Sequence, residues 1–429
     1  MLFKDITILD DKFQIKDHAY VGIKEDKIDY IGNEMPTKDY GRIYEGKGKL
    51  LMTGFYNAHA HCPMTLLRGY GENMALQDWL FKKIFPFEDQ LDGNAVYNAC
   101  MLSMAEALKF GIVSLSDMYY FMDDIARAFI ESGVKGNLSR SISHFDDSDF
   151  LTSYRADEMR DSFEKYHGAA DGRVLMDISL HSEYTTTEPC VIDVANYAKE
   201  VGAGMQVHVS ETQSEVKECI ERHGKTPVKY LADLGAFDVP TTAAHCVWLE
   251  DDDYPVLKEK GVTVAVNPIS NLKLASGICN VPKLMENGIN VAIGTDGVAS
   301  NNSLNFLEEM KTFALLAKMQ FNDPTAITPV EALQAATING AKAQQRKDCG
   351  LLKEGYKADL IVMDINQPNM HPVHNLVNNI VYSACSGDII MTMVDGKVLY
   401  ENGEYMTIDL EKVIFETEKS TQEILRKLK

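Results

Sequence analysis

The sequence predicts an α/β protein built on a (β/α)₈ TIM-type barrel, with a small composite β-sandwich domain formed by both chain ends. Three observations predict it. A length of 429 residues suits a barrel of roughly 250 to 300 residues plus a smaller domain. Through the middle of the chain, short β-rich runs alternate with longer helical runs, as in parallel strands joined by crossover helices. Both ends instead carry short strand patterns with tight turns.

The two ends have the same β-rich texture. Residues 1–50 show no helical period, and after about residue 350 the dipeptides Asp395-Gly396 and Asn402-Gly403 are strong hairpin signals. We therefore expect 1–50 and 355–429 to pair into the composite domain and 51–354 to form the barrel.

Eight barrel strands are expected from short runs rich in Val, Ile and other β-forming residues. They are 50–61, 111–120, 135–143, 174–184, 203–211, 241–248, 262–270 and 291–300. Intervening segments such as 95–110 and 303–320 are rich in Ala, Leu, Met and Glu, which favour crossover helices.

Composition excludes several classes of partner. With 63 acidic and 42 basic residues, the net charge of -21 disfavours binding to nucleic acid or to an anionic membrane. The start, MLFKDITILDDKF, carries charges where a signal peptide is apolar, and no run approaches the roughly 20 apolar residues of a membrane span. The eight cysteines include no CxxC pair, so we expect reduced, mostly buried thiols and a cytoplasmic protein.

Metal-binding residue types recur at the ends of the predicted strands, where barrel enzymes hold their chemistry. They are His59, His61, His181, His208, His245 and Asp296. Residues two apart in a strand point to the same side, so His59 and His61 form a chelating pair. A lone strand histidine is more often a core residue, but five of the eleven histidines share this placement.

Three histidines and a carboxylate with an open position match a catalytic Zn²⁺ or Fe²⁺ site. A bound ion would bring the pKa of its water towards about 7. Glu211, three residues after His208, can face that water and a substrate ring nitrogen together, which suits a proton shuttle. The run 174–184 contains no lysine that could bridge two metals, so we expect one divalent ion per chain, with Zn²⁺ preferred.

These residues lie in motifs that resemble the amidohydrolase superfamily, in the branch of chlorohydrolases and amino-heterocycle deaminases. The motifs are GFYNAHAHCPMTLLRG (54–69), HVSET (208–212), AAHCVWL (243–249), NPISNLKLASG (267–277), GTDGVASNNSL (294–304) and EGYKADLIVMD (354–364). The resemblance implies one metal held by His59, His61, His208 and Asp296, with His245 bonding the hydroxide or completing the sphere. It also implies that Asp296 accepts the water's proton and that Glu211 delivers one to the ring.

Within that branch the chain is most similar to the 5'-methylthioadenosine/S-adenosylhomocysteine deaminases. The resemblance implies that Trp79 lines the pocket, that Glu88 binds the ribose hydroxyls, and that His181 lies beside the nucleoside. It places Arg140 on the carboxylate of the homocysteine tail.

A second arginine of such enzymes has no clear match here, Arg155 being only nearby. Arg140 could instead pair with Asp146 or Asp147. The resemblance implies a small purine nucleoside as the binding partner. It also implies that the protein forms a homo-oligomer.

Three alternatives remain open. Guanine-type deaminases share the tryptophan and the FPxE run of 78–88, but the run after the fourth strand lacks their PRF-type motif. Triazine-type dechlorination ranks third. The last alternative is a barrel without catalytic activity that acts as a binding or assembly protein. It ranks lowest because such proteins lose metal ligands, whereas this sequence retains the whole set.

Overall fold

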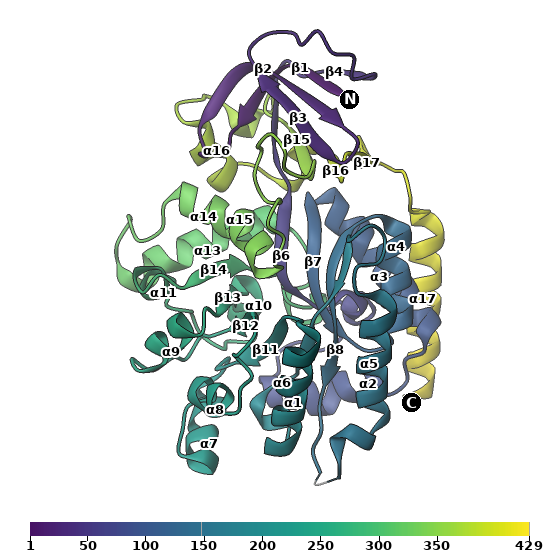
Figure 1. Ribbon diagram of the computed structural model, residues 1–429, viewed down its shortest axis with the longest axis vertical. Helices are drawn as coiled ribbons and strands as arrows, with labels where there is room; N and C mark the ends of the chain where they lie inside the picture. Colours follow the sequence, from purple (N-terminus) through teal and green to yellow (C-terminus); the bar gives the residue numbers. More distant parts are fainter. Residues whose placement is uncertain (147, 429) are drawn as a thin grey trace.

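A computed structural model describes residues 1–146 and 148–428, and its larger part is a nearly closed parallel barrel (Figure 1). Its strands pair in parallel in the order of the chain. They are β6 (Phe55–Ala60), β7 (Ile112–Tyr119), β8 (Lys135–Ile142), β9 (Val174–Met176) with β10 (Ile178–Leu180), β11 (Met205–Val209), β12 (Thr241–His245), β13 (Thr263–Val266) and β14 (Asn290–Ile293). A parallel bridge between Ala60 and Asp296 brings the two edges of the sheet together.

The first predicted barrel strand, 50–61, is two strands in the structure. β5 (Lys49–Thr53) joins the sheet of the chain ends, and β6 begins the barrel. Gly54 lies between them, where an added Cβ would come within 2.3 Å of Val113. The predicted strands 262–270 and 291–300 also end early, because Pro268 and Val298 begin the short helices α10 (Pro268–Lys273) and α12 (Val298–Asn301).

Helices surround the barrel sheet (Figure 1). The longer ones are α3 (Gly93–Lys109), α4 (Met122–Ser132), α5 (Tyr154–Tyr166), α6 (Glu188–Val201), α7 (Gln213–His223) and α13 (Phe306–Phe321). The shorter ones are α8 (Pro227–Asp233), α9 (Asp253–Glu259), α11 (Val281–Glu286), α14 (Pro329–Ala336) and α15 (Ile338–Ala343). Local sequence explains several boundaries: Asp92 accepts the Ala95 N–H at the start of α3, and Gly202 ends α6 in the left-handed conformation.

The chain ends form a second sheet, as expected, seen at the top of Figure 1. Its order is β18-β17-β16-β15-β5-β1-β2-β3, with β4 on β1. The strands are β1 (Leu2–Leu9), β2 (Ile15–Lys24), β3 (Lys27–Gly32), β4 (Ile43–Glu45), β15 (Leu360–Asp364), β16 (Ile389–Val394), β17 (Lys397–Glu401) and β18 (Glu404–Tyr405). The predicted turn Asp395-Gly396 joins β16 to β17. Helix α17 (Leu410–Lys427) leaves this sheet and packs along α3.

A buried charge cluster ties the barrel to the sheet. Lys135, at the start of β8, lies 2.6 Å from Asp395 and also contacts Asp359 at close range. The Lys135 side chain is fully buried, and losing one partner of such a cluster leaves an uncompensated charge. This buried contact therefore helps to hold the sheet against the barrel.

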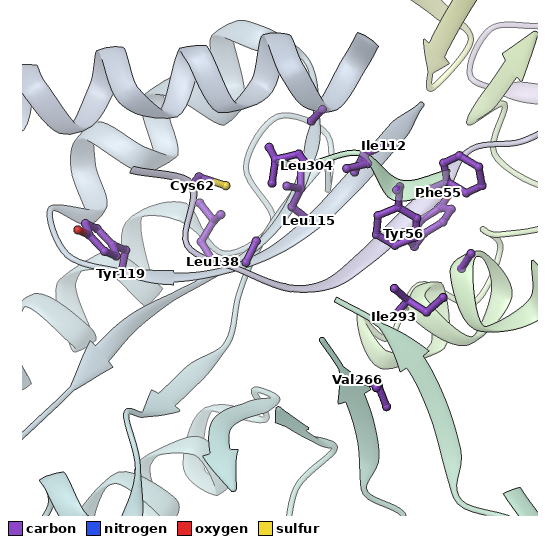
Figure 2. Close-up of a cluster of buried hydrophobic side chains, with 14 of the residues drawn as sticks. Phe55, Tyr56, Cys62, Ile112, Leu115, Tyr119, Leu138, Val266, Ile293 and Leu304 are labelled. Atoms are coloured by element: carbon purple, nitrogen blue, oxygen red, sulfur yellow. The ribbon is translucent and has the colours of Figure 1, made fainter. Parts of the chain in front are cut away.

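Apolar side chains fill the space between the barrel strands and their helices. Figure 2 shows part of this core, where Phe55 and Tyr56 from β6 lie near Ile112 of β7. Cys385 is exposed and the other seven cysteines are buried as free thiols. Within the described part of the chain, no helix is both long and apolar enough to cross a membrane.

Candidate active site

The structure brings the predicted metal-binding residues together at the carboxyl ends of the barrel strands. His59 lies in β6, and His61 follows it directly. His208 lies in β11, and Asp296 follows β14. The Nε2 atom of His61 is 3.2 Å from Asp296 Oδ1 and 3.3 Å from His208 Nε2, and His59 Nε2 is 3.6 Å from the same carboxylate oxygen. Ligand atoms from strands far apart in sequence thus face one centre.

Two of these histidines are oriented from behind by backbone carbonyls. His61 Nδ1 lies 2.6 Å from the Met118 oxygen, and His208 Nδ1 lies 2.7 Å from the His181 oxygen. A carbonyl can only accept, so each Nδ1 carries a proton and each Nε2 faces the centre. This arrangement is usual behind metal-bound histidines.

A divalent cation fits this donor set. The buried His59 Nε2 has no hydrogen-bond partner among the described residues, which a metal bond would explain. Burial lowers the pKa of His59 to about 4 and holds that of His208 well below its ordinary value, so both are neutral, as ligands must be. One group of candidate ligand atoms, all within 4.8 Å of one another, comprises His59, His208, His245 and Asp296. His61 lies just beside it.

Hydrogen bonds hold Asp296 in position, although its backbone conformation is strained. Its Oδ2 accepts from the hydroxyl of Ser270 at 2.6 Å, and its Oδ1 accepts from the Gly297 N–H at 2.8 Å. Its φ is +60°, a left-handed conformation that costs a non-glycine residue on the order of 1 to 3 kcal/mol. Burial alone would raise the pKa of Asp296, but contacts with His59 and His61 bring it well below its ordinary value.

His245 and Glu211 face each other beside this centre. His245 Nε2 lies 3.7 Å from Glu211 Oε2. The amide nitrogens of Asn271 and Asn267 lie 2.9 and 3.2 Å from His245 Nδ1, so Nδ1 accepts and the proton is on Nε2. Burial raises the pKa of Glu211, which suits a group that must both hold and release a proton.

The substrate-binding candidates line a cavity of about 50 Å³ over the cluster. Trp79 and Glu88 come from the segment of α1 (Leu76–Trp79), a π-helical turn at 80–84 and α2 (Phe85–Glu88), and His181 follows β10. Glu88 accepts a hydrogen bond from Tyr119, and burial raises its pKa to about 7. π-helical turns of this kind often occur at functional sites.

Arg140 lies in a second cavity of about 460 Å³ that shares Phe85, Glu88 and Tyr120 with the first. Its Nε donates to Glu158 at 2.8 Å, and it also contacts the Ser141 carbonyl. Glu158 is thus its ion-pair partner among the described residues; Asp147 lies outside them. Arg155 lines the same cavity. The two arginines therefore share one chamber.

Several residues at the site were not singled out from the sequence. Four of them lie in the motif 267–277, where the spacing of polar residues is the one feature of the sequence that could have indicated them. They are Asn267, Ser270, Asn271 and Ser276. Glu158 on α5 and Tyr119 on β7 gave no such signal. They contact the site only because the barrel brings separate strands and helices together.

Comparison with known proteins gives a consistent result. The model described as "Amidohydrolase family" matches residues 50–399. A 5-methylthioadenosine/S-adenosylhomocysteine deaminase of Thermoanaerobacter pseudethanolicus is 40% identical over 100% of both chains. A 5'-deoxyadenosine deaminase of Methanosarcina mazei is 40% identical over 99% of this chain and 97% of its own. The solved adenosine deaminase of Xanthomonas campestris with bound zinc has a TM-score of 0.92 at 27% identity, covering 99% and 98% of the two chains.

Proposed function

Because the chain belongs to the amidohydrolase family, we propose that it hydrolyses the 6-amino group of an adenine nucleoside to give the inosine analogue and ammonia. The preferred substrates are nucleosides altered at the 5' position: 5'-methylthioadenosine, S-adenosylhomocysteine or 5'-deoxyadenosine. The observation that carries the proposal is the convergence of His59, His61, His208 and Asp296 on one centre, beside Glu211. The full-length relatives named for these activities support the substrate class.

One divalent ion, with Zn²⁺ preferred, would be held by His59, His61, His208 and Asp296. When bound, it acts as a Lewis acid and supplies hydroxide at neutral pH. His245 favours a hydrogen-bonding role over a ligand role, because two asparagine amides direct its proton to Nε2. It would then orient the attacking oxygen.

The proton movements fall to two carboxylates. Asp296 accepts the proton that the attacking water loses, since its low pKa leaves it ionised and its Oδ1 faces the cluster. Glu211 carries the water's other proton to the ring nitrogen next to the amino group. The proton on Asp296 then passes through Glu211 to the amino group as it leaves as ammonia, so both carboxylates return to their starting state. The raised pKa of Glu211 and its place in the pocket wall support this shuttle.

Substrate recognition would use the two joined cavities. Trp79 and His181 border the base in the inner cavity, and Glu88 accepts hydrogen bonds from the ribose hydroxyls. The 5' substituent would extend into the outer cavity, where Arg140 and Arg155 offer positive charge to a carboxylate. A methylthio or methyl group would instead meet Phe85 and Tyr120.

A substrate panel tests the proposal. The loss of adenine absorbance as hypoxanthine forms is followed for adenosine, 5'-deoxyadenosine, 5'-methylthioadenosine and S-adenosylhomocysteine, with ammonia release measured for guanine and chloride release for a chlorotriazine. We expect the highest kcat/KM among the 5'-altered adenine nucleosides. Turnover of guanine or the chlorotriazine alone would assign the chain to one of the alternatives.

A further inference from the structure

Glu215 is a buried carboxylate directly behind the turn that carries Glu211. Its Oε1 accepts the Ser210 N–H at 2.8 Å, and its Oε2 accepts the Glu211 N–H at 2.7 Å. The hydroxyl of Thr212 accepts the Glu215 N–H at 3.2 Å, which completes a capping box at the start of α7. The carboxylate thus holds the backbone of the very residue proposed to move protons.

The turn requires such support. Ser210 has a φ of +52°, and a left-handed serine persists only where the surrounding structure over-determines it. The N–H of Ser210 is held by Glu215, and its carbonyl accepts from Val247 at 3.0 Å and Trp248 at 2.9 Å. These two residues follow His245, so the Glu211 turn and the His245 turn are bonded to each other.

Two further hydrogen bonds lead from Trp248 back to the Glu211 side chain. The indole N–H of Trp248 donates to the Ser276 carbonyl at 2.6 Å. The Ser276 hydroxyl then donates to Glu211 Oε1 at 3.2 Å. Both the backbone and one carboxylate oxygen of Glu211 are fixed, while Oε2 remains toward His245.

We propose that Glu215 and Ser276 are positioning residues for proton transfer by Glu211. Glu215 fixes the turn from behind, and Ser276 fixes which carboxylate oxygen faces the pocket. This inference rests on the proposed function, in which Glu211 is the proton carrier. Helix capping alone would also explain Glu215, and the chain offers a matched comparison: Thr328 and Glu331 form the same box at the start of α14, outside both cavities of the site.

A double-mutant cycle separates positioning from capping. In the otherwise wild-type enzyme, Glu215→Gln should lower kcat by about 10- to 100-fold with KM within about threefold, because only proton transfer is misaligned. Ser276→Ala should lower kcat by about 3- to 10-fold, the scale of one neutral hydrogen bond. In a Glu211→Gln background both changes should cost less than about twofold, since the group they position no longer transfers a proton. The control Glu331→Gln should lower the melting temperature and leave kcat unchanged.

Equal losses from Glu215→Gln in both backgrounds would overturn the inference and leave Glu215 as a helix cap. If Glu215→Gln does not accumulate as folded protein, the Ser276→Ala cycle decides by the same criterion. Failure of the proposed function would give a different result. The single variant Glu211→Gln would in that case retain nearly full kcat on every substrate.

Discussion

The Tyr119 hydroxyl donates to Glu88 Oε1 across 2.5 Å, and Glu88 lies in the wall shared by the two cavities. Burial raises the pKa of the Glu88 carboxyl to about 7, and the Tyr119 hydrogen bond acts in the opposite direction. Glu88 is therefore neutral below about pH 7 and charged above it. Because a charged carboxylate accepts stronger hydrogen bonds from a diol, its protonation state should govern nucleoside binding.

The first prediction concerns pH. The kcat/KM for adenosine-type substrates should rise as pH passes through about 7 and Glu88 ionises. Tyr119→Phe removes a hydrogen bond that favours the charged form, so this rise should move to higher pH. Steady-state rates from pH 5.5 to 9 measure it, with Glu88→Gln as the reference that lacks the titration. A rise that persists unchanged in Glu88→Gln belongs to another group.

The second prediction tests the diol contact itself. Glu88→Gln weakens two charge-assisted hydrogen bonds, so adenosine-type substrates should lose on the order of 1 to 3 kcal/mol in kcat/KM. The corresponding 2',3'-dideoxynucleoside cannot make these bonds and should be nearly unaffected. Equal losses on both substrates would show that Glu88 supports the pocket rather than the ribose.

The third prediction distinguishes two alternative ligand sets. Both contain His59, His208 and Asp296, and they differ in whether His61 or His245 is the fourth ligand. If His61 is a ligand and His245 is not, His61→Ala should lower the metal content from one ion per chain, whereas His245→Ala should retain the ion and lose kcat. Elemental analysis after dialysis measures the content, and chelation should abolish turnover of the wild type. Loss of metal only from His245→Ala would reverse the assignment.

The fourth prediction concerns the proton carrier. Glu211→Gln should lower kcat by roughly 100-fold or more, the scale of a lost general acid or base, with metal content and folding intact. Kinetics, elemental analysis and circular dichroism on the same preparation check all three. A kcat within about threefold of wild type would mean that another group moves the proton.

The fifth prediction addresses the outer cavity. Arg140→Ala should lower kcat/KM for S-adenosylhomocysteine by about 10- to 100-fold and leave 5'-methylthioadenosine within a few-fold, because only the former carries a carboxylate. Glu158→Gln is the control, since it breaks the ion pair and keeps the arginine. If both variants lose activity on every substrate and have lower melting temperatures, Arg140 serves only to hold α5 against β8.

Much of the architecture follows from the sequence. Period-two runs with histidine at their carboxyl ends predict parallel strands whose ends meet, and the barrel does bring His59, His208 and Asp296 together. Strand ends were less predictable. The sequence offered no reason to divide 50–61 between two sheets. The residues on either side of Gly54 are buried alike, so their pattern shows no break, and Gly54 is required only because it approaches Val113 closely in the folded structure.

The sequence by itself determined the barrel, the pairing of the chain ends and the candidate ligand types, because hydrophobic period and turn chemistry are local properties. Only the tertiary structure decided what surrounds each candidate. Glu158 reaches Arg140 from 18 residues away, and Ser276 reaches Glu211 from 65 residues away. Such contacts depend on how strands and helices pack, and no spacing along the chain encodes them. The proton state of Glu88 likewise comes from burial, which exists only once the barrel has closed around it.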